Sequence, residues 1–282
     1  MHKAPSAVRR PPSVLCYHRI GGPLELGVTR VSANVFRRQM ETLARSGWTT
    51  LTLAQFANPQ SAIHNPQSFL LSFDDGFASL AEHAYPVLAD LGFTATTFVI
   101  TDFVGATNTW DVPYAFRRLP HLDWAAIEQW RARGFDFQSH SARHTRLTWL
   151  DDAGAQDELE RSRCTLMGRL GPDAGVAIAY PFGAADARVA GLAQTAGYQL
   201  GFGGARRAAD PLRLGRTPVY SWDLGSVPLG LRDGVLGRLG RGVAVVANRC
   251  AVGTSALLAL RNAGLGVLRP PPQRDGQEDS AG

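Results

Sequence analysis

An apolar segment that ends in two adjacent carboxylates constrains the fold of this chain more than any other feature. Residues 68–73 read S-F-L-L-S-F and are followed at once by Asp74, Asp75 and Gly76. Such a segment predicts a buried strand that ends in a turn. Parallel α/β proteins build their active sites where strands end, so the two carboxylates are candidate functional groups. Alternatively, they form a turn that caps the next helix, because Asp favours both positions.

The rest of the chain alternates strand-like and helix-like segments, which predicts a parallel sheet covered by helices. Because 282 residues can bury one large core, a single α/β barrel domain is expected. The expected strands are 13–17, 49–53, 69–73, 93–100, 135–138, 176–180 and 198–202. The expected helices begin after caps at Ser32, Asp123 and Asp151, run from the D-D-G turn to Gly92 with a bend or break at Pro86, and cover 187–196.

Two histidines follow another of these strands. His140 and His144 come after the segment 135–138, and a spacing of four on one helical turn would point both imidazoles the same way. Two imidazoles and one carboxylate leave coordination positions open, which is typical of a catalytic metal site and not of a closed structural one. Zinc suits these ligands, and cobalt, nickel or iron also fit. The alternative interpretation is a pair of ordinary surface histidines in a loop.

Taken together, the motifs resemble the polysaccharide deacetylase family, whose members share the NodB homology domain. Its first motif corresponds to S-F-D-D-G at 72–76, its second to H-S-A-R-H at 140–144, and its third, in part, to A-Y-P-F-G at 179–183. The segment L-C-Y-H-R at 15–19 is similar to the first strand of one branch of the family. The resemblance covers residues 13–222 and implies a distorted (β/α) barrel of the NodB type.

The resemblance also implies roles for individual residues. Asp75, His140 and His144 would be the metal ligands. Asp74 would be the general base that takes a proton from the attacking water. The backbone N–H of Phe182 would donate to the oxyanion of the tetrahedral intermediate, while its side chain shapes the pocket. A plain turn at that position is compatible with the same role.

The chain departs from the family pattern in two places. The family's arginine, which orients the catalytic carboxylate, is Ala179 here, so Asp74 must find another partner or go without one. Arg213 and Arg216 are the candidates, and we favour Arg216. A solvated arginine is the alternative. No histidine follows His144, although the family has a late histidine that acts as the general acid. We hypothesise that His18, at the end of the first expected strand, takes this role; a buried structural histidine is the alternative.

Further residues are assigned less directly. Tyr180 of the third motif and Trp222 are candidates for contacting or orienting the substrate, with Trp222 as a sugar platform. Tryptophan is equally common in a hydrophobic core, so that alternative stays open. His64, His83 and His121 lie in loop or helix-face contexts and are expected to be solvated.

Composition limits the partners. The net charge is +5, but no basic cluster interleaved with aromatics occurs, so no nucleic-acid partner is expected. The three cysteines are odd in number and far apart, which fits ordinary thiols in a reducing compartment. Residues 1–12 lack the apolar core of a signal peptide and are expected to be flexible. A cytoplasmic location, or one at the inner face of the membrane, is therefore expected.

The end of the chain is expected to differ from the barrel. Residues 223–267 predict a helical extension that packs on the barrel or makes peripheral membrane contact, because its apolar stretch is too interrupted to span a bilayer. Residues 268–282 are rich in Pro, Gln, Asp and Gly and predict a disordered tail.

The function implied is that of a metal-dependent hydrolase that removes an N-linked acetyl group from an N-acetylated sugar. The substrate would be a polysaccharide, an oligosaccharide or a lipid-linked glycan. The alternative is a non-catalytic member that binds a glycan or a metal, which the missing arginine and late histidine favour. The presence of Asp74 argues for catalysis, because metal binding needs Asp75 and the histidines but no base.

Overall fold

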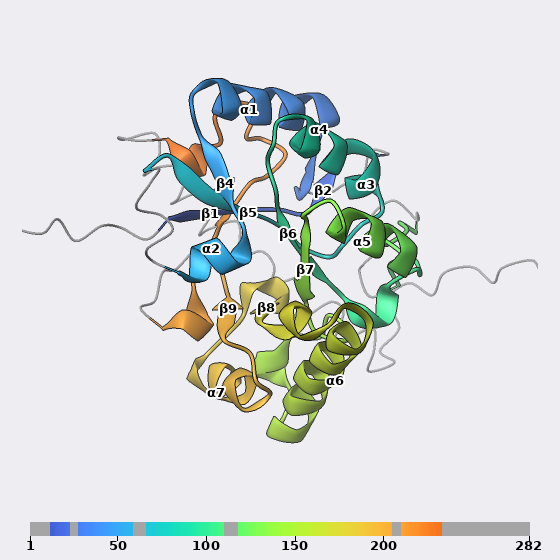
Figure 1. The fold of residues 1–282 in the computed structure, drawn as a ribbon. Helices are drawn as coiled ribbons and strands as arrows, with labels where there is room; N and C mark the ends of the chain where they lie inside the picture. The colour runs from blue at the N-terminus through green and yellow to red at the C-terminus, as the bar shows by residue number, and fades with distance from the viewer. Residues whose placement is uncertain (1–11, 23–27, 59–65, 110–117, 205–209, 233–282) are drawn as a thin grey trace, which may run out of the picture.

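The fold is built on one curled parallel sheet. The computed structural model describes residues 12–22, 28–58, 66–109, 118–204 and 210–232. In this part of the chain the sheet has eight strands, all paired in parallel (Figure 1). Their order is β10 (Thr217–Pro218), β1 (Ser13–Tyr17), β5 (Ser68–Phe73), β6 (Thr96–Val99), β7 (Asp136–Ser139), β8 (Ala177–Ala179) and β9 (Leu200–Phe202), with β4 (Thr49–Leu51) also beside β5.

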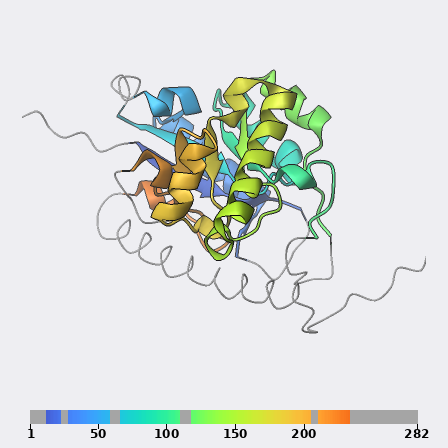
Figure 2. The ribbon, with the colours of Figure 1, turned by 90° about the horizontal axis from the view of Figure 1, so that it is seen from below.

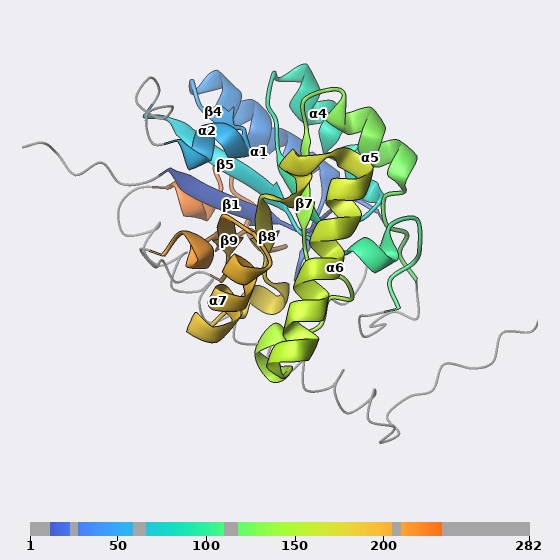
Figure 3. The ribbon, with the colours of Figure 1, turned by 60° about the horizontal axis from the view of Figure 1, so that its bottom comes forward.

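Helices cover the outside of this sheet. They are α1 (Ala33–Arg45), α2 (Leu53–Ala57), α3 (Ser79–His83), α4 (Tyr85–Asp90), α5 (Trp124–Arg131), α6 (Asp152–Leu170) and α7 (Ala187–Thr195). The helices α1, α4 and α5 pack along one flank, and α6 and α7 lie side by side on the other (Figures 2 and 3). The parallel bridge between Phe202 and Leu214 brings the chain after β9 towards β10. The expected distorted α/β barrel is confirmed.

The helix starts follow from the capping residues in the sequence. The side chains of Ser32, Asp123 and Asp151 accept backbone N–H groups at the beginnings of α1, α5 and α6, as predicted. The helix expected after the D-D-G turn is divided at Ala84, two residues before Pro86. Proline cannot donate to the preceding turn, so the chain begins a new helix there.

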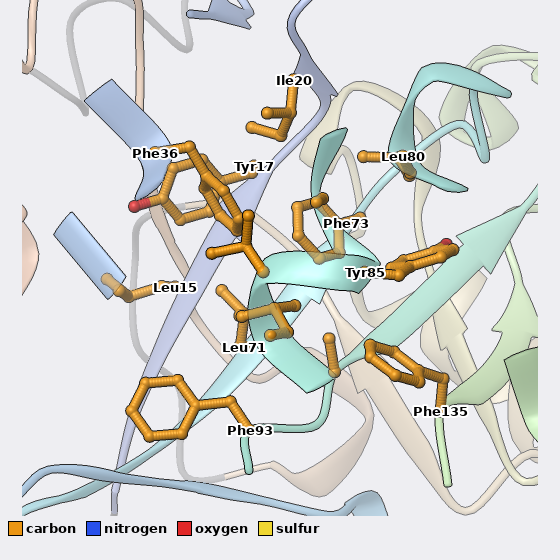
Figure 4. Packing of buried hydrophobic residues seen from close by; sticks show 14 of the residues in the cluster. Leu15, Tyr17, Ile20, Phe36, Leu71, Phe73, Leu80, Tyr85, Phe93 and Phe135 are labelled. Carbon is orange, nitrogen blue, oxygen red and sulfur yellow. The ribbon is translucent and has the colours of Figure 1, made fainter. Parts of the chain in front are cut away.

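Alternation along β1 separates two sets of side chains. Leu15 and Tyr17 join the large cluster beneath α1 and α4, where Tyr17 packs edge-on against Phe36 (Figure 4). Val14 points the opposite way and joins the cluster inside the curl of the sheet, together with Phe98. Successive strand residues face opposite sides, so residues 16 and 18 share the inner side with Val14.

Several predicted strands are longer than the observed ones, and the prediction that residues 52 and 53 belong to a strand is wrong. The strand predicted at 49–53 ends at Leu51, and Leu53 instead begins α2. Thr52 and Gln55 form a reciprocal capping box, which satisfies the first free N–H groups of that short helix. The Thr-x-x-Gln pattern in the sequence carries this signal.

The ends of the chain are described only in part. Of the expected C-terminal extension, residues 223–232 are described, and they contain a short 3₁₀ helix at Leu229–Leu231 instead of an α-helix. The expectations for 1–11 and 233–282, including the membrane contact and the tail, fall outside the described residues. Among the helices that are described, none is long and apolar enough to cross a membrane.

Gly76 fixes the turn after β5, and we expect Gly76→Ala to destabilise the protein strongly. Its φ is +70°, and an added Cβ would lie 2.8 Å from the side chain of Val99. The left-handed backbone alone costs an alanine about 1–2 kcal/mol, and overpacking adds about 1–3 kcal/mol. Gly92→Ala is the matched control, because Gly92 has a φ of +68° and open space around it. Equal losses in urea unfolding for the two variants would contradict this prediction.

Candidate active site

Asp75, His140 and His144 form a compact buried cluster. Oδ1 of Asp75 lies 3.4 Å from Nε2 of His140 and 3.4 Å from Nε2 of His144. Asp75 follows β5 and the two histidines follow β7, so the ends of two nearby parallel strands build the cluster. The three residues predicted to bind metal are therefore together in space.

The two histidines do not lie on a helical turn, and that expectation is wrong. The segment after β7 is a loop in which Ser141 and His144 adopt left-handed conformations, with φ of 64° and 61°. The imidazoles nevertheless meet, with ring centroids 4.9 Å apart. A loop can place the two rings together because backbone torsions outside the helical range bring their Nε2 atoms to one point.

Glu158, a fully buried residue of α6, stabilises this loop. Its carboxylate accepts the backbone N–H groups of Ala142 at 3.0 Å and Arg143 at 2.8 Å. The same carboxylate pairs with Nε of Arg143 at 2.6 Å. A carboxylate that accepts several N–H bonds holds a loop firmly in an otherwise unfavourable conformation. No motif in the sequence indicates this role, because Glu158 lies outside the segment that holds the two histidines.

Hydrogen bonds to neighbouring groups orient His140 and Asp75 within the cluster. Nδ1 of His140 lies 2.7 Å from the carbonyl oxygen of Ala179, so it donates there and leaves Nε2 facing Asp75. Nδ1 of His121 is 2.8 Å from the carbonyl oxygen of Asp75, and its ring stacks on Phe77. His121 is buried, so the expectation that it is solvated is wrong.

The cluster fits a divalent cation. Oδ1 of Asp75 is buried and has no hydrogen-bond partner in the described part of the chain, although two imidazole nitrogens face it. Burying a carboxylate oxygen without a partner is costly, and a cation held between Asp75, His140 and His144 would remove that cost. One oxygen and two nitrogen donors suit a catalytic zinc or a related first-row ion.

Asp74 lies beside this cluster, with Oδ2 3.9 Å from Nε2 of His140, and its carboxylate pairs with an arginine. Nη1 and Nη2 of Arg216 donate to Oδ1 and Oδ2 of Asp74 at 2.6 and 2.7 Å. Both side chains are almost fully buried. Nε2 of His18 lies 4.0 Å from Oδ2 of Asp74, and the His18 imidazole is 23% exposed. The structure thus brings Arg216 and His18, but not Arg213, to the candidate base.

Charge compensation keeps both carboxylates ionised. Burial opposes ionisation of Asp74, but the charges of Arg216 and His140 outweigh it, so the pKa of Asp74 lies below its ordinary value. The pKa of Asp75 is also lowered, because attraction to His140 and His144 exceeds the effect of burial. Burial lowers the pKa of His144 to about 3. That imidazole is therefore neutral at ordinary pH, as a metal ligand must be.

The remaining candidates differ in accessibility. Phe182 has a left-handed φ of 59°, and its ring centroid lies 4.7 Å from that of His144, directly beside the cluster. Trp222 is 43% exposed and packs against Tyr220. The side chain of Tyr180 is fully buried and donates its hydroxyl to the carbonyl oxygen of Leu212. The prediction that the Tyr180 side chain contacts the substrate is therefore wrong, because the side chain is buried and its hydroxyl is hydrogen-bonded inside the core.

Comparisons with known proteins agree with this arrangement. The family model described as polysaccharide deacetylase matches residues 62–201. The chain is 28% identical over 190 residues to YxkH of Bacillus subtilis, named as a polysaccharide deacetylase, covering 67% of this chain and 62% of that protein. It is 26% identical over 202 residues to poly-β-1,6-N-acetyl-D-glucosamine N-deacetylase of Staphylococcus epidermidis. This match covers 68% of this chain and 67% of that protein. A solved structure from Bacillus anthracis, assigned to the same class, is 25% identical, with a TM-score of 0.64 over 76% of this chain and 66% of that chain.

The fold and the matched motifs define an α/β deacetylase barrel of the NodB type. The chain resembles the polysaccharide deacetylase family in its matched segment, in its relatives and in its fold. The match spans less than two thirds of the length of the Bacillus subtilis relative. The family resemblance predicted from the motifs is confirmed.

We expect Glu158→Gln to weaken metal binding by about 10- to 100-fold, the usual effect of losing a group that orients metal ligands. A neutral amide oxygen is a weaker acceptor than the carboxylate for the N–H groups of Ala142 and Arg143. Glu160→Gln is the control, because Glu160 lies on the exposed side of the same helix. Calorimetric titration with zinc measures both affinities. Unchanged affinity in a folded Glu158→Gln protein would contradict the role assigned to this carboxylate.

Proposed function

We propose that this protein hydrolyses the acetamide of an N-acetylated glycan, releasing acetate and leaving a free amine on the sugar. The observation that carries this proposal is the placement of Asp74 between two groups of partners. On one side lies the Asp75–His140–His144 cluster, and on the other lies the guanidinium of Arg216. A protein that only bound metal would not need a second, oriented carboxylate at this position.

A divalent cation bound by Asp75, His140 and His144 would polarise the amide carbonyl and acidify the attacking water. We propose zinc, because one carboxylate and two imidazoles suit it; cobalt, nickel and iron share this preference. The other steps belong to side chains of this chain. Arg216 holds the carboxylate of Asp74 in one orientation by two hydrogen bonds, so that an unprotonated oxygen faces the site.

The proposed proton transfers use three groups of this chain. Asp74 takes one proton from water as its oxygen attacks the carbonyl carbon. The backbone N–H of Phe182 donates to the oxygen that becomes negative. His18, which is partly exposed and 4.0 Å from Asp74, gives a proton to the departing nitrogen as the C–N bond breaks. The oxygen of the water bonds to the acetyl carbon and leaves in acetate, and the nitrogen stays on the sugar as an amine.

A relative and an exposed tryptophan support a proposal for the substrate class. One relative is named as an N-deacetylase of poly-β-1,6-N-acetyl-D-glucosamine. Trp222 offers an exposed aromatic face beside Tyr220, and such faces suit the apolar side of a sugar ring. We propose an N-acetylhexosamine polymer, oligomer or lipid-linked glycan as the substrate, with Trp222 as part of its platform.

The purified chain should release acetate from a panel of N-acetylhexosamine oligomers, lose this activity to a chelator and regain it with zinc or cobalt. Asp74→Asn should abolish turnover but retain the metal, because the amide replaces the base and leaves the ligands intact. His140→Ala should lose both turnover and metal. Acetate release is followed by a coupled assay and metal content by atomic absorption. Equal turnover in Asp74→Asn and the wild type would refute the proposed mechanism.

The ion pair also predicts a change in pH dependence. Arg216 lowers the pKa of Asp74, so its removal raises that pKa and the base becomes protonated at a higher pH. In Arg216→Gln, the acidic limb of the kcat/KM profile should therefore move up by about 1–3 pH units. Arg216→Lys keeps the charge and should move it less, and Arg213→Gln should leave it in place. An acidic limb at the wild-type position in folded Arg216→Gln would rule this coupling out.

A further inference from the structure

A second group of side chains of the types that bind metals lies beside the first. Sγ of Cys16, a ring nitrogen of His18 and a carboxylate oxygen of Asp74 all lie within 4.8 Å of one another. Cys16 and His18 are two residues apart at the end of β1, so the alternation of the strand turns both towards the inside of the curled sheet. Asp74 reaches the same point from the end of the neighbouring β5, where its N–H donates to the carbonyl oxygen of Tyr17.

We propose that Cys16, His18 and Asp74 form a second, weaker site for a thiophilic divalent cation such as zinc or cadmium, and that filling it inhibits the enzyme. One sulfur, one nitrogen and one oxygen donor are the ligand types that zinc and cadmium prefer over magnesium or manganese. Each ion bound displaces the proton of the Cys16 thiol to the solvent, so that a thiolate is the ligand.

The surroundings of the three residues support ion binding. Cys16 and Asp74 are buried, whereas the imidazole of His18 is 23% exposed and offers a path from solvent. Nδ1 of His18 is buried without a hydrogen-bond partner in the described part of the chain. The thiol of Cys16 makes a long contact, 3.6 Å, with the carbonyl oxygen of the adjacent Tyr17, and it also interacts with the side chains of Asp74 and Ser72. Because the hydrogen bonds of a thiol are weak, neither ligand would have to give up a strong hydrogen bond to accept a cation.

Arg216 makes this site weaker than the first one. Its guanidinium already binds both oxygens of Asp74, and its positive charge repels a nearby cation. Each carboxylate oxygen has two lone pairs, so Asp74 can still offer one to an ion. Oδ2 of Asp74 lies 4.0 Å from Nε2 of His18 and 3.9 Å from Nε2 of His140, which places it between the two clusters. The Asp75–His140–His144 cluster should therefore fill first and the second site only when metal is in excess.

Occupation of the second site would remove two groups from catalysis at once. An ion on Asp74 and His18 blocks the proposed base and the proposed acid. This inhibition rests on the proposed function, whereas the binding itself does not. The two parts can be measured separately.

The binding test uses the full chain carrying Cys164→Ser and Cys250→Ser, in which Cys16 is the remaining cysteine. Cobalt and cadmium are added stepwise while the ultraviolet absorption is recorded. A sulfur-to-metal charge-transfer band should be absent during the first equivalent and grow during the second. Adding Cys16→Ser should remove the band and reduce the stoichiometry from two ions to one. Manganese should give no band in either protein.

The inhibition test compares each protein with itself, so that differences in basal activity do not matter. Excess zinc should lower the initial rate of acetate release in the wild type. In Cys16→Ser the zinc concentration for half-inhibition should rise by at least about tenfold, as expected for the loss of a ligand. His18→Gln, which removes a different ligand of the same site, should lose the second equivalent as well.

The outcomes separate the two proposals. A band that appears without any acetate release would support the second site and count against the proposed function. Acetate release with a single bound ion and no sulfur band at excess cadmium would overturn the second site and leave the proposed function intact. If Cys16→Ser does not fold, the titration of the protein that retains Cys16 decides the question alone, because the band either follows the first equivalent or is absent.

Discussion

The buried ion pair between Asp74 and Arg216 is the interaction on which the rest of the site depends. Asp74 ends the central strand β5, and Arg216 immediately precedes β10 at the edge of the sheet, so the pair joins segments 142 residues apart. Two adjacent buried carboxylates would repel each other, and without the guanidinium one of them would have to be protonated. Breaking a buried pair leaves an uncompensated charge and costs about 3–5 kcal/mol. Closure of the curled sheet and ionisation of the site are therefore linked.

The same pair limits what Asp74 can do as the proposed base. A carboxylate whose pKa lies below the ordinary value has little affinity for a proton, whereas efficient general bases have pKa values near the working pH. Such a group accepts a proton from water only when that water is itself acidified. The adjacent Asp75–His140–His144 cluster offers a place for the cation that does this. The orientation that Arg216 gives to Asp74 is thus useful only together with the neighbouring ligands.

Sequence patterns predicted the parts of the structure that depend on local chemistry. The strand before Asp74, the caps of α1, α5 and α6, and the candidate metal ligands Asp75, His140 and His144 follow from short segments. The proximity of His18 to Asp74 was predicted from its place at the end of the first strand, whereas Arg216 was predicted as the replacement for the arginine that is missing at Ala179. The conformation of the loop holding His140 and His144 could not be predicted, because Glu158 from a later helix sets it. The burial of His121 and Tyr180 likewise depends on partners that are distant in sequence.

The geometry of β1 ties the proposed acid and the proposed second metal site to one constraint. A strand that turns residue 18 towards Asp74 must also turn residue 16 the same way, because alternate residues share a face. Any side chain at position 16 therefore lies near the proposed acid and base. A thiol is small enough to be buried there without a strong hydrogen bond, but it is also a good ligand for thiophilic ions. The arrangement that brings His18 to the site thus makes the proposed binding of thiophilic ions depend on the residue at position 16.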